Sequence, residues 1–347
     1  MFEIDGSQKS GSGTILRIAV ALAAIKGEPL HITNIRKNRP KAGLKPQHLE
    51  AVLTAAKLCN AETKGAVLDS KELWFTPHRI TGGMFKAEIG TAGNIPMLLM
   101  TVLPICLFAR DDVKLQVTKG GTDTSQAPTV NYLRNVFLPA LNRMGVKTEL
   151  TIQRYGYYPK GNGEATLTVK PTPRLQPFRL ETFGKLQDVK GISVCTFLAD
   201  RRVAERQAKA ANQALTNKGY NAEIRVVNDV SNPVQKGSSI ALWAETDSGA
   251  ILGADSIGEL KRTAEAVGMQ AGENLLSELS VQPTVDVHLS DMLIPYIALS
   301  QGNSSYLTRT ASEHLEANIW LAEKMLGAHF KVSKLRSLYQ VEKLAVA

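Results

Sequence analysis

A histidine at the start of the last long predicted helix is the first residue whose position suggests chemistry. His314 follows Thr310 and Glu313, which have the spacing of a capping box, so His314 is expected in or just after the first helical turn. There the exposed N–H groups and the helix dipole favour the neutral imidazole. Neutral imidazole can attack phosphorus or accept a proton near pH 7. The alternative is a structural histidine packed at the cap. The polar run 301–305 is expected to be a loop that could line a cleft.

A basic loop is the second candidate. Residues 36–48 hold five Lys and Arg residues before the first acidic residue, Glu50, and Pro and Gly within the segment indicate a loop. The guanidinium forks of Arg36 and Arg39 suit phosphate oxygens, so phosphate binding is favoured over a merely solvated loop. Gln47 and His48 begin the helix that follows, where His48 could hydrogen-bond phosphate or be structural.

Further polar loops precede other predicted helices. The Gly/Ser segment 5–17 could bring backbone N–H groups to a phosphate, and a plain strand-to-helix turn is equally consistent with it. Segments 120–128 and 155–163 are similar in character. Asp291, in segment 286–295, could bind a ligand or a metal, although helix capping is the more common role for such a residue. His31, His78 and His329 are assigned no chemistry.

Repeated units of helix and sheet must position these residues. A helix that ends at Gly or Asn and runs into a strand recurs around Asn60, Gly145 and Gly327. The first unit is predicted to have strands near residues 2–4, 30–35, 66–68 and 73–75, and helices over 14–25 and 46–59. A second unit is predicted over residues 90–169, with helices that begin near Ile95 and Pro128.

The middle of the chain has a different pattern. Strands are predicted at 191–198, 222–227, 240–244 and 251–253, and helices at 203–217 and 256–277. We therefore predict an α+β protein of repeated βαβαββ-type modules with a small inserted α/β domain. Residues 1–184 and 280–347 would form the catalytic domain, and residues 185–279 the insert.

Composition narrows the class of partner. A chain of 347 residues with 44% hydrophobic residues can bury a substantial core. Its net charge of +9 favours polyanionic partners such as nucleic acid or nucleotides. No apolar run reaches transmembrane length, so no membrane partner is expected. Three scattered cysteines, Cys59, Cys106 and Cys195, are typical of reduced core residues in a cytoplasmic protein.

Taken together, these segments resemble the RNA 3′-terminal phosphate cyclase family. The similar segments follow in family order over nearly the whole chain: 5–17, 35–49, 90–93, 101–104, 120–123, 157–159, 291–295, and His314 with Asn318. The resemblance implies modules similar to the C-terminal domain of translation initiation factor three. It also implies an inserted α/β domain.

The resemblance further implies a reaction. His314 would attack the α-phosphorus of ATP and form a covalent histidyl-adenylate. AMP would then pass to an RNA 3′-phosphate, and the neighbouring 2′-hydroxyl would close a 2′,3′-cyclic phosphate. A divalent cation, Mg²⁺ or Mn²⁺, should assist, and its ligands and the oligomeric state stay unassigned. The resemblance assigns phosphate or RNA binding to Arg17, Arg36, Arg39, Gln47 and His48, and ATP binding to Met100, Pro128, His288, Leu289, Ser290, Asp291 and Met292.

Three positions depart from the family pattern. Ser10, preceded by Lys9, stands where a metal-binding glutamate is usual. Met100 replaces a glutamine that contacts the nucleotide, and His288 replaces a tyrosine that stacks on adenine. Because of these departures, the alternative is that this protein is a catalytically weak relative of the cyclases that binds RNA or assists ribosome assembly. A third and less favoured alternative is an enolpyruvyl transferase, which has similar modules. That class of enzyme has no need of a histidine nucleophile.

Overall fold

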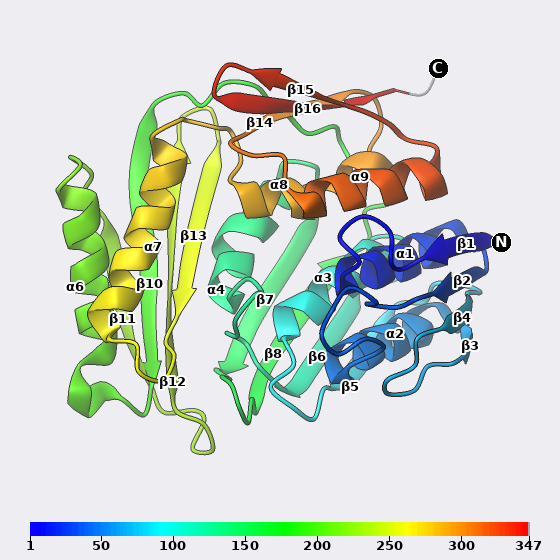
Figure 1. Ribbon diagram of the computed structural model, residues 1–347, viewed down its shortest axis with the longest axis horizontal. Coiled ribbons are helices and arrows are strands. Elements are labelled where there is room, and N and C mark those ends of the chain that lie inside the picture. Colours follow the sequence, from blue (N-terminus) through cyan, green and yellow to red (C-terminus); the bar gives the residue numbers. More distant parts are fainter. Residues whose placement is uncertain (346–347) are drawn as a thin grey trace.

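The computed structural model describes residues 1–345 and confirms the expected α+β class. Four sheets of four strands each are joined by helices. Figure 1 shows the first module on the right, the third module along the top and the insert on the left.

The first module has the predicted βαβαββ order. Its sheet order is β1-β2-β4-β3, with β1 and β2 parallel. Ser12 caps α1, and left-handed Gly27 and Asn60 end the two helices. The elements are β1 (Phe2–Asp5), α1 (Gly13–Lys26), β2 (Leu30–Thr33), α2 (Pro46–Cys59), β3 (Glu62–Lys64) and β4 (Leu73–Thr76).

The prediction of a strand at residues 66–68 is wrong. The paired strand is β3, and Gly65, with φ of 82°, turns the chain out of the sheet immediately after it. Val67 and Leu68 are exposed at the turn. The amide of Asp69 instead bonds the carbonyl of Leu44 at 2.8 Å, which ties this turn to the basic loop.

The second module repeats the topology with sheet order β5-β6-β8-β7. It begins at Gly83 rather than at the predicted Gly90, because the mostly exposed strand β5 carries little apolar pattern. The helix expected near Pro128 begins at Val130 and contains a π-helical turn. The elements are β5 (Gly83–Glu88), α3 (Ile95–Cys106), β6 (Val113–Gly120), α4 (Val130–Tyr132), η1 (Leu133–Phe137), α5 (Leu138–Asn142), β7 (Lys147–Arg154) and β8 (Gly163–Lys170).

The third module is split in sequence. Its first strand, β9, comes before the insert and pairs in parallel with β14, which comes after it. The sheet order β15-β16-β14-β9, read from β9, matches the other two modules. The elements are β9 (Arg179–Leu180), α8 (Val287–Leu299), β14 (Ser304–Thr308), α9 (Glu313–Leu326), β15 (His329–Leu335) and β16 (Leu338–Leu344).

Between β9 and α8 lies a separate sheet with the order β11-β10-β12-β13. Helices α6 and α7 pack together beside it (Figure 1). The helix predicted from residue 256 begins only at Ala264, because β13 extends to Ile257 and Thr263 forms the cap. The elements are β10 (Leu186–Thr196), η2 (Ala199–Arg201), α6 (Val203–Thr216), β11 (Glu223–Asp229), β12 (Gly237–Thr246), β13 (Ile251–Ile257) and α7 (Ala264–Leu279).

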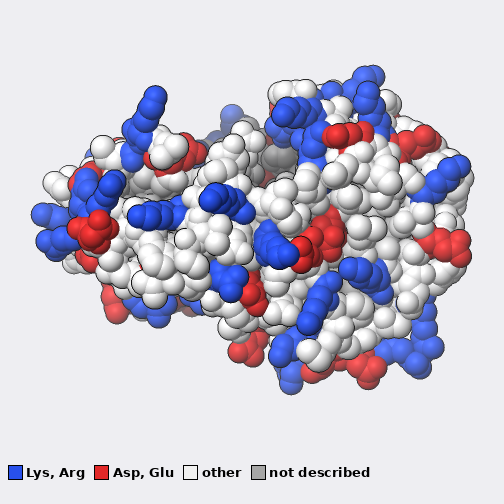
Figure 2. Space-filling model, turned by 90° about the horizontal axis from the view of Figure 1, so that it is seen from below, with Lys and Arg blue, Asp and Glu red and all other residues white. Residues whose placement is uncertain are grey.

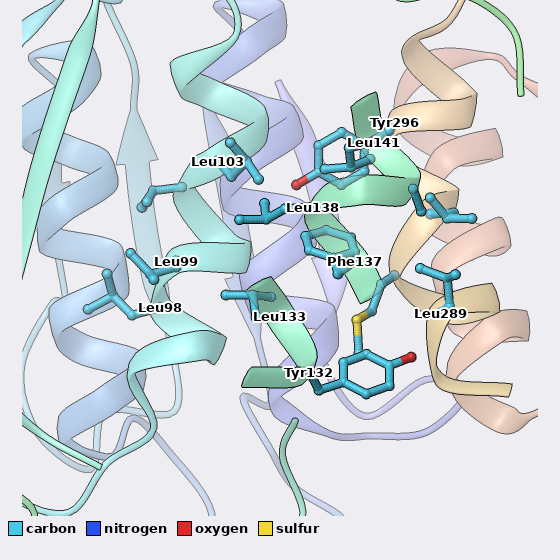
Figure 3. Close-up of a cluster of buried hydrophobic side chains, with 14 of the residues drawn as sticks. Leu98, Leu99, Leu103, Tyr132, Leu133, Phe137, Leu138, Leu141, Leu289 and Tyr296 are labelled. Atoms are coloured by element: carbon cyan, nitrogen blue, oxygen red, sulfur yellow. The ribbon is translucent and has the colours of Figure 1, made fainter. Parts of the chain in front are cut away.

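The core lies where helices of the modules meet. Helix α1 packs against α2, α3 and α9. Figure 3 shows α3, the 130–142 helix and α8 converging on buried side chains. In that cluster, Phe137 and Tyr296 make an edge-on contact with 5.7 Å between ring centroids. The three cysteines are free and buried, as expected. Within residues 1–345, no helix is long and apolar enough to cross a bilayer.

Candidate active site

One cavity of about 600 Å³ collects side chains from the three modules and the insert. Most of the site residues predicted from the sequence line it, although they come from segments far apart in the chain. The predicted residues that line it are Arg17, Arg36, Arg39, Gln47, His48, Met100, Pro128, His288, Asp291, Met292 and His314.

Leu289 and Ser290 do not reach the cavity, contrary to expectation. Leu289 is 1% exposed and belongs to the core drawn in Figure 3. The hydroxyl of Ser290 lies 3.1 Å from that of Tyr306 in the neighbouring strand. Because 287–299 is helical, His288, Asp291 and Met292 share the cavity face while Leu289 and Ser290 point into the core.

His314 lies in the first turn of α9, as expected, but the predicted cap residue is wrong. Ser312, and not Thr310, caps the helix, and its hydroxyl accepts from the Leu315 amide at 3.0 Å. Burial and the charges of Arg17 and Arg39 lower the pKa of His314. Nδ1 is buried without a partner among the described residues, which leaves Nε2 as the nitrogen open to the cavity. The ring is therefore held neutral, with one nitrogen available as a nucleophile.

Asp291 does not cap a helix. Asp286 caps α8, and Asp291 lies one turn further on, where its carboxylate accepts from the Ser312 hydroxyl at 2.6 Å. The Asn318 amide donates to the Asp291 carbonyl at 2.8 Å. Burial raises the pKa of Asp291 to about 7. Residue 291 thus joins α8 to the first two turns of α9, on either side of His314.

Three arginines line the cavity opposite this helix pair. Arg17 donates to the Thr14 hydroxyl at 3.1 Å, and burial with the charges of Arg36 and Arg39 lowers its pKa to about 10. Arg36 donates to the carbonyl oxygens of residues 41 and 43, which fixes the basic loop. Across residues 1–345, none of the three arginines forms an ion pair. The three positive charges therefore repel one another without a carboxylate to neutralise them, which favours binding of a polyanion.

His48 and Gln47 complete the basic side of the cavity. Burial and the charges of Arg17 and Arg36 lower the pKa of His48 to about 2, so its ring is neutral. A side chain at position 13 would collide with that ring, so Gly13 permits the close approach of α1. The side-chain carbonyl oxygen of Gln47 accepts from the backbone N–H of Asn94 at 2.7 Å and links α2 to the start of α3.

No carboxylate occupies position 10 of the Gly/Ser loop, and the carboxylate of Asp5 accepts from Ser7 and Asn34. The Ser10 hydroxyl lies 3.0 Å from that of Ser12, the residue that caps α1 and lines the cavity. In the part of the chain that the structure describes, no group of three or more His, Cys, Asp or Glu side chains is arranged to hold a metal ion.

Asp255 and Tyr132 are among the cavity residues that were not predicted from the sequence. Asp255, from β13, accepts from the Thr129 amide at 2.7 Å, and burial raises its pKa. An acidic residue in an otherwise apolar strand was the available signal. Tyr132 donates to both carboxylate oxygens of Asp286 at 2.7 and 2.9 Å, and the Gly253 amide donates to the same group. This buried contact holds the second module, the insert and the third module around the cavity.

The remaining polar loops have different positions. Gln126 and Ala127 of segment 120–128 reach the cavity beside Pro128. Segment 155–163 instead meets the insert, where Asn232 donates to the carbonyl oxygens of residues 155 and 161. The 301–305 run does not line the His314 cavity. Residues 303–305 line a second cavity, of about 440 Å³, beside Arg179 and Lys343.

Comparison with known proteins gives consistent matches over nearly the whole chain. The profile of the family described as RNA 3′-terminal phosphate cyclase matches residues 8–332. A protein of that name from Pyrococcus furiosus is 43% identical over 332 residues, 96% of this chain and 95% of the relative. Its namesakes from Pyrobaculum neutrophilum and Methanosarcina barkeri are each 41% identical over 341 residues and 98% of this chain, covering 97% and 99% of the relatives.

Proposed function

Because this chain belongs to the RNA 3′-terminal phosphate cyclase family, we propose that it converts RNA 3′-phosphate ends to 2′,3′-cyclic phosphates with ATP. One observation carries the proposal. The open Nε2 of a neutral His314 shares a cavity with three arginines that form no ion pair in residues 1–345. A neutral nucleophile beside uncompensated cations suits attack on a phosphorus that carries negative oxygens.

In the first step, Nε2 of His314 bonds to the α-phosphorus of ATP as the bond to the bridging oxygen breaks. Pyrophosphate leaves with that electron pair, and the arginines stabilise the charge that develops on it. The low pKa of His314 matters because a protonated ring has no lone pair to donate. We propose that the triphosphate lies toward Arg17, Arg36 and Arg39, with Gln47 and His48 as further contacts.

In the second step, an oxygen of the RNA 3′-phosphate attacks the adenylate phosphorus and the P–N bond to His314 breaks. The RNA end then carries AMP. The adjacent 2′-hydroxyl attacks the 3′-phosphorus, gives up its proton and expels AMP, which is a far better leaving group than an oxide ion. The two transfers return His314 to its starting form.

The nucleoside of ATP is assigned to the other end of the cavity. Pro128, His288 and Met292 provide apolar and planar surfaces there, with Met100 and Asp291 nearby. A histidine ring offers a smaller stacking surface than the tyrosine usual in the family. We assign the divalent cation mainly to the ATP phosphates, because the chain offers no cluster of ligands in residues 1–345. The free cysteines fit a reducing cytoplasmic setting.

The test uses α-labelled ATP with Mg²⁺ or Mn²⁺. The wild-type protein should acquire acid-labile, base-stable label. His314→Ala should acquire none, and His329→Ala, a matched change on strand β15, should be labelled normally. Addition of 3′-phosphorylated RNA should discharge the label as AMP and yield the cyclic end. No label with either metal would overturn the proposal.

The catalytically weak alternative is less favoured, because the cavity retains both the nucleophile and the arginines. It would gain support only if RNA bound while no adenylate formed.

A further inference from the structure

One end of the inserted sheet carries a surface that the adenylation chemistry does not use. By register, Thr196 is opposite both Asp229 and Gly237, and Ser239 is opposite Ile257. The loop after β10, the loop between β11 and β12 and the loop after β13 therefore lie at the same end. The Lys160 amide donates to the Gln235 side chain at 3.2 Å, which adds segment 155–163 to this end.

These loops expose apolar side chains beside cations. Leu260 is 98% exposed, Tyr158 78% and Val230 71%, and Phe197 and Val234 are also exposed. Five cations accompany them, and none forms an ion pair in residues 1–345. They outnumber the acidic residues Asp200 and Glu259 of the same loops. We define the insert end surface as Tyr158, Lys160, Phe197, Arg201, Arg202, Val230, Val234, Lys236, Leu260 and Lys261.

Figure 2 views the molecule from the side to which this end points. On its left, over the insert, Lys and Arg side chains surround uncharged surface. Exposed rings among unpaired cations are the combination that binds single-stranded nucleic acid, because bases stack on the rings and phosphates meet the cations.

Two segments connect this surface to the lining of the cavity. Asp255 lines the cavity, and Leu260 follows it five residues later, a span of at most roughly 17 Å at the rise of an extended strand. On the other side, an isolated β-bridge joins Asp123, in the loop that leads to Pro128, to Tyr157, the neighbour of Tyr158. These connections place the surface within a few nucleotides' reach of an RNA 3′ end in the cavity.

We propose that the insert end surface binds the single-stranded RNA segment on the 5′ side of the reacting end. Tyr158 and Phe197 stack on bases, and the cations contact phosphates without reading sequence. The proposal rests on the proposed function, since that function supplies the RNA end. It would give this end of the insert, together with segment 155–163, a role in substrate binding that is separate from the adenylation step.

The test compares two 3′-phosphorylated probes, a single-stranded RNA of about twelve nucleotides and a dinucleotide that reaches only the cavity. Binding of the long probe is measured by fluorescence anisotropy, without ATP. Tyr158→Ala should weaken it about fivefold or more, the loss expected from one stacked base, and Tyr158→Phe should retain it. Lys236→Ala/Lys261→Ala should weaken it and reduce the salt slope by about 0.7 per lost contact.

The matched control is Lys209→Ala/Lys218→Ala, which removes the same charge from the insert outside this surface. It should bind like wild type. All variants, including the control, should form adenylate and cyclise the dinucleotide at wild-type rates. In the surface variants kcat/KM should fall for the long probe only. Because binding is read without ATP, failure of adenylation would contradict the proposed function and leave this measurement valid.

Three results would overturn the proposal. The first is equal binding of the long probe by wild type and both surface variants. The second is equal weakening by the control pair, which would indicate general attraction to a basic protein. The third is a concentration-dependent dimer that dissociates in Tyr158→Ala while RNA binding is unchanged, because the surface would then join two copies of the chain.

Discussion

The hydroxyl of Ser312 donates to the carboxylate of Asp291 at 2.6 Å, and His314 follows two residues later. The same hydroxyl accepts from the Leu315 amide at the helix start. One side chain therefore caps α9 and attaches it to α8, so the position of the proposed nucleophile depends on a contact between two helices.

Ser312→Ala should lower both stability and adenylation. It removes the cap and leaves the Asp291 carboxyl without this donor, a loss of about 1–2 kcal/mol in the free energy of unfolding. Urea unfolding and single-turnover labelling with α-labelled ATP measure the two effects. Ser312→Thr keeps the hydroxyl and should keep most of both. If the Ala variant were adenylated at the wild-type rate, Ser312 would not position His314.

The stability of the fold should depend on the ionisation of Asp291. Burial raises the pKa of its carboxyl from 3.8 to about 7 in the folded state. The protonated form is thus favoured on folding, so this contribution is fully present below pH 3.8 and is lost as pH rises through about 7. Asp291→Asn cannot ionise. Its unfolding free energy relative to wild type should therefore increase between about pH 4 and pH 8. A constant difference across that range would contradict the raised pKa.

Adenylation should stay active below the usual titration range of histidine. The pKa of His314 is lowered by burial and by Arg17 and Arg39, so the neutral ring persists as pH falls below 6.5. His48, with a pKa of about 2, does not titrate there, whereas Asp291, with a pKa of about 7, does. The acidic limb of the rate profile is therefore measured in Asp291→Asn, in which only His314 of these three residues titrates. Arg39→Gln should move that limb to higher pH. The measurement is the single-turnover labelling rate at saturating ATP, and an unmoved limb would separate Arg39 from His314.

Ser10→Glu should raise adenylation if the missing carboxylate limits the reaction. The Ser10 hydroxyl lies 3.0 Å from that of Ser12, which lines the cavity, so a glutamate at position 10 could share a cation with the ATP phosphates. The concentration of Mg²⁺ or Mn²⁺ that gives half-maximal labelling should fall. Ser10→Gln, which has the same length without the charge, is the control. An unchanged rate and metal requirement in Ser10→Glu would rule this explanation out.

Tyr132→Phe should destabilise the contact between modules and insert. The lost hydroxyl leaves two buried oxygens of Asp286 with fewer donors, and a hydrogen bond to a charged group contributes about 1.5–3 kcal/mol. Urea unfolding measures the change. Tyr339→Phe, in strand β16, is the control and should have little effect. Equal stabilities for the two variants would remove Tyr132 from this role.

Much of the fold was predictable from local pattern. Helix ends at Asn60 and Gly327 were visible because only residues tolerant of left-handed backbone stop a helix in this way. The strands β5 and β9 could not be predicted in this way, because β5 is mostly exposed and β9 has only two residues. Pairing with β14 defines β9, and that partner lies beyond the insert.

The sequence by itself determined the residue types of the site, from His314 through the arginine loop to Asp291, because their order along the chain carries the family resemblance. Only the tertiary structure decided their roles. Asp291 faces Ser312 rather than capping a helix, Leu289 and Ser290 point into the core, and Asp255 enters the cavity from the insert. The physical reason is that spacing fixes which face of an element a side chain occupies, whereas packing between elements fixes what that face meets.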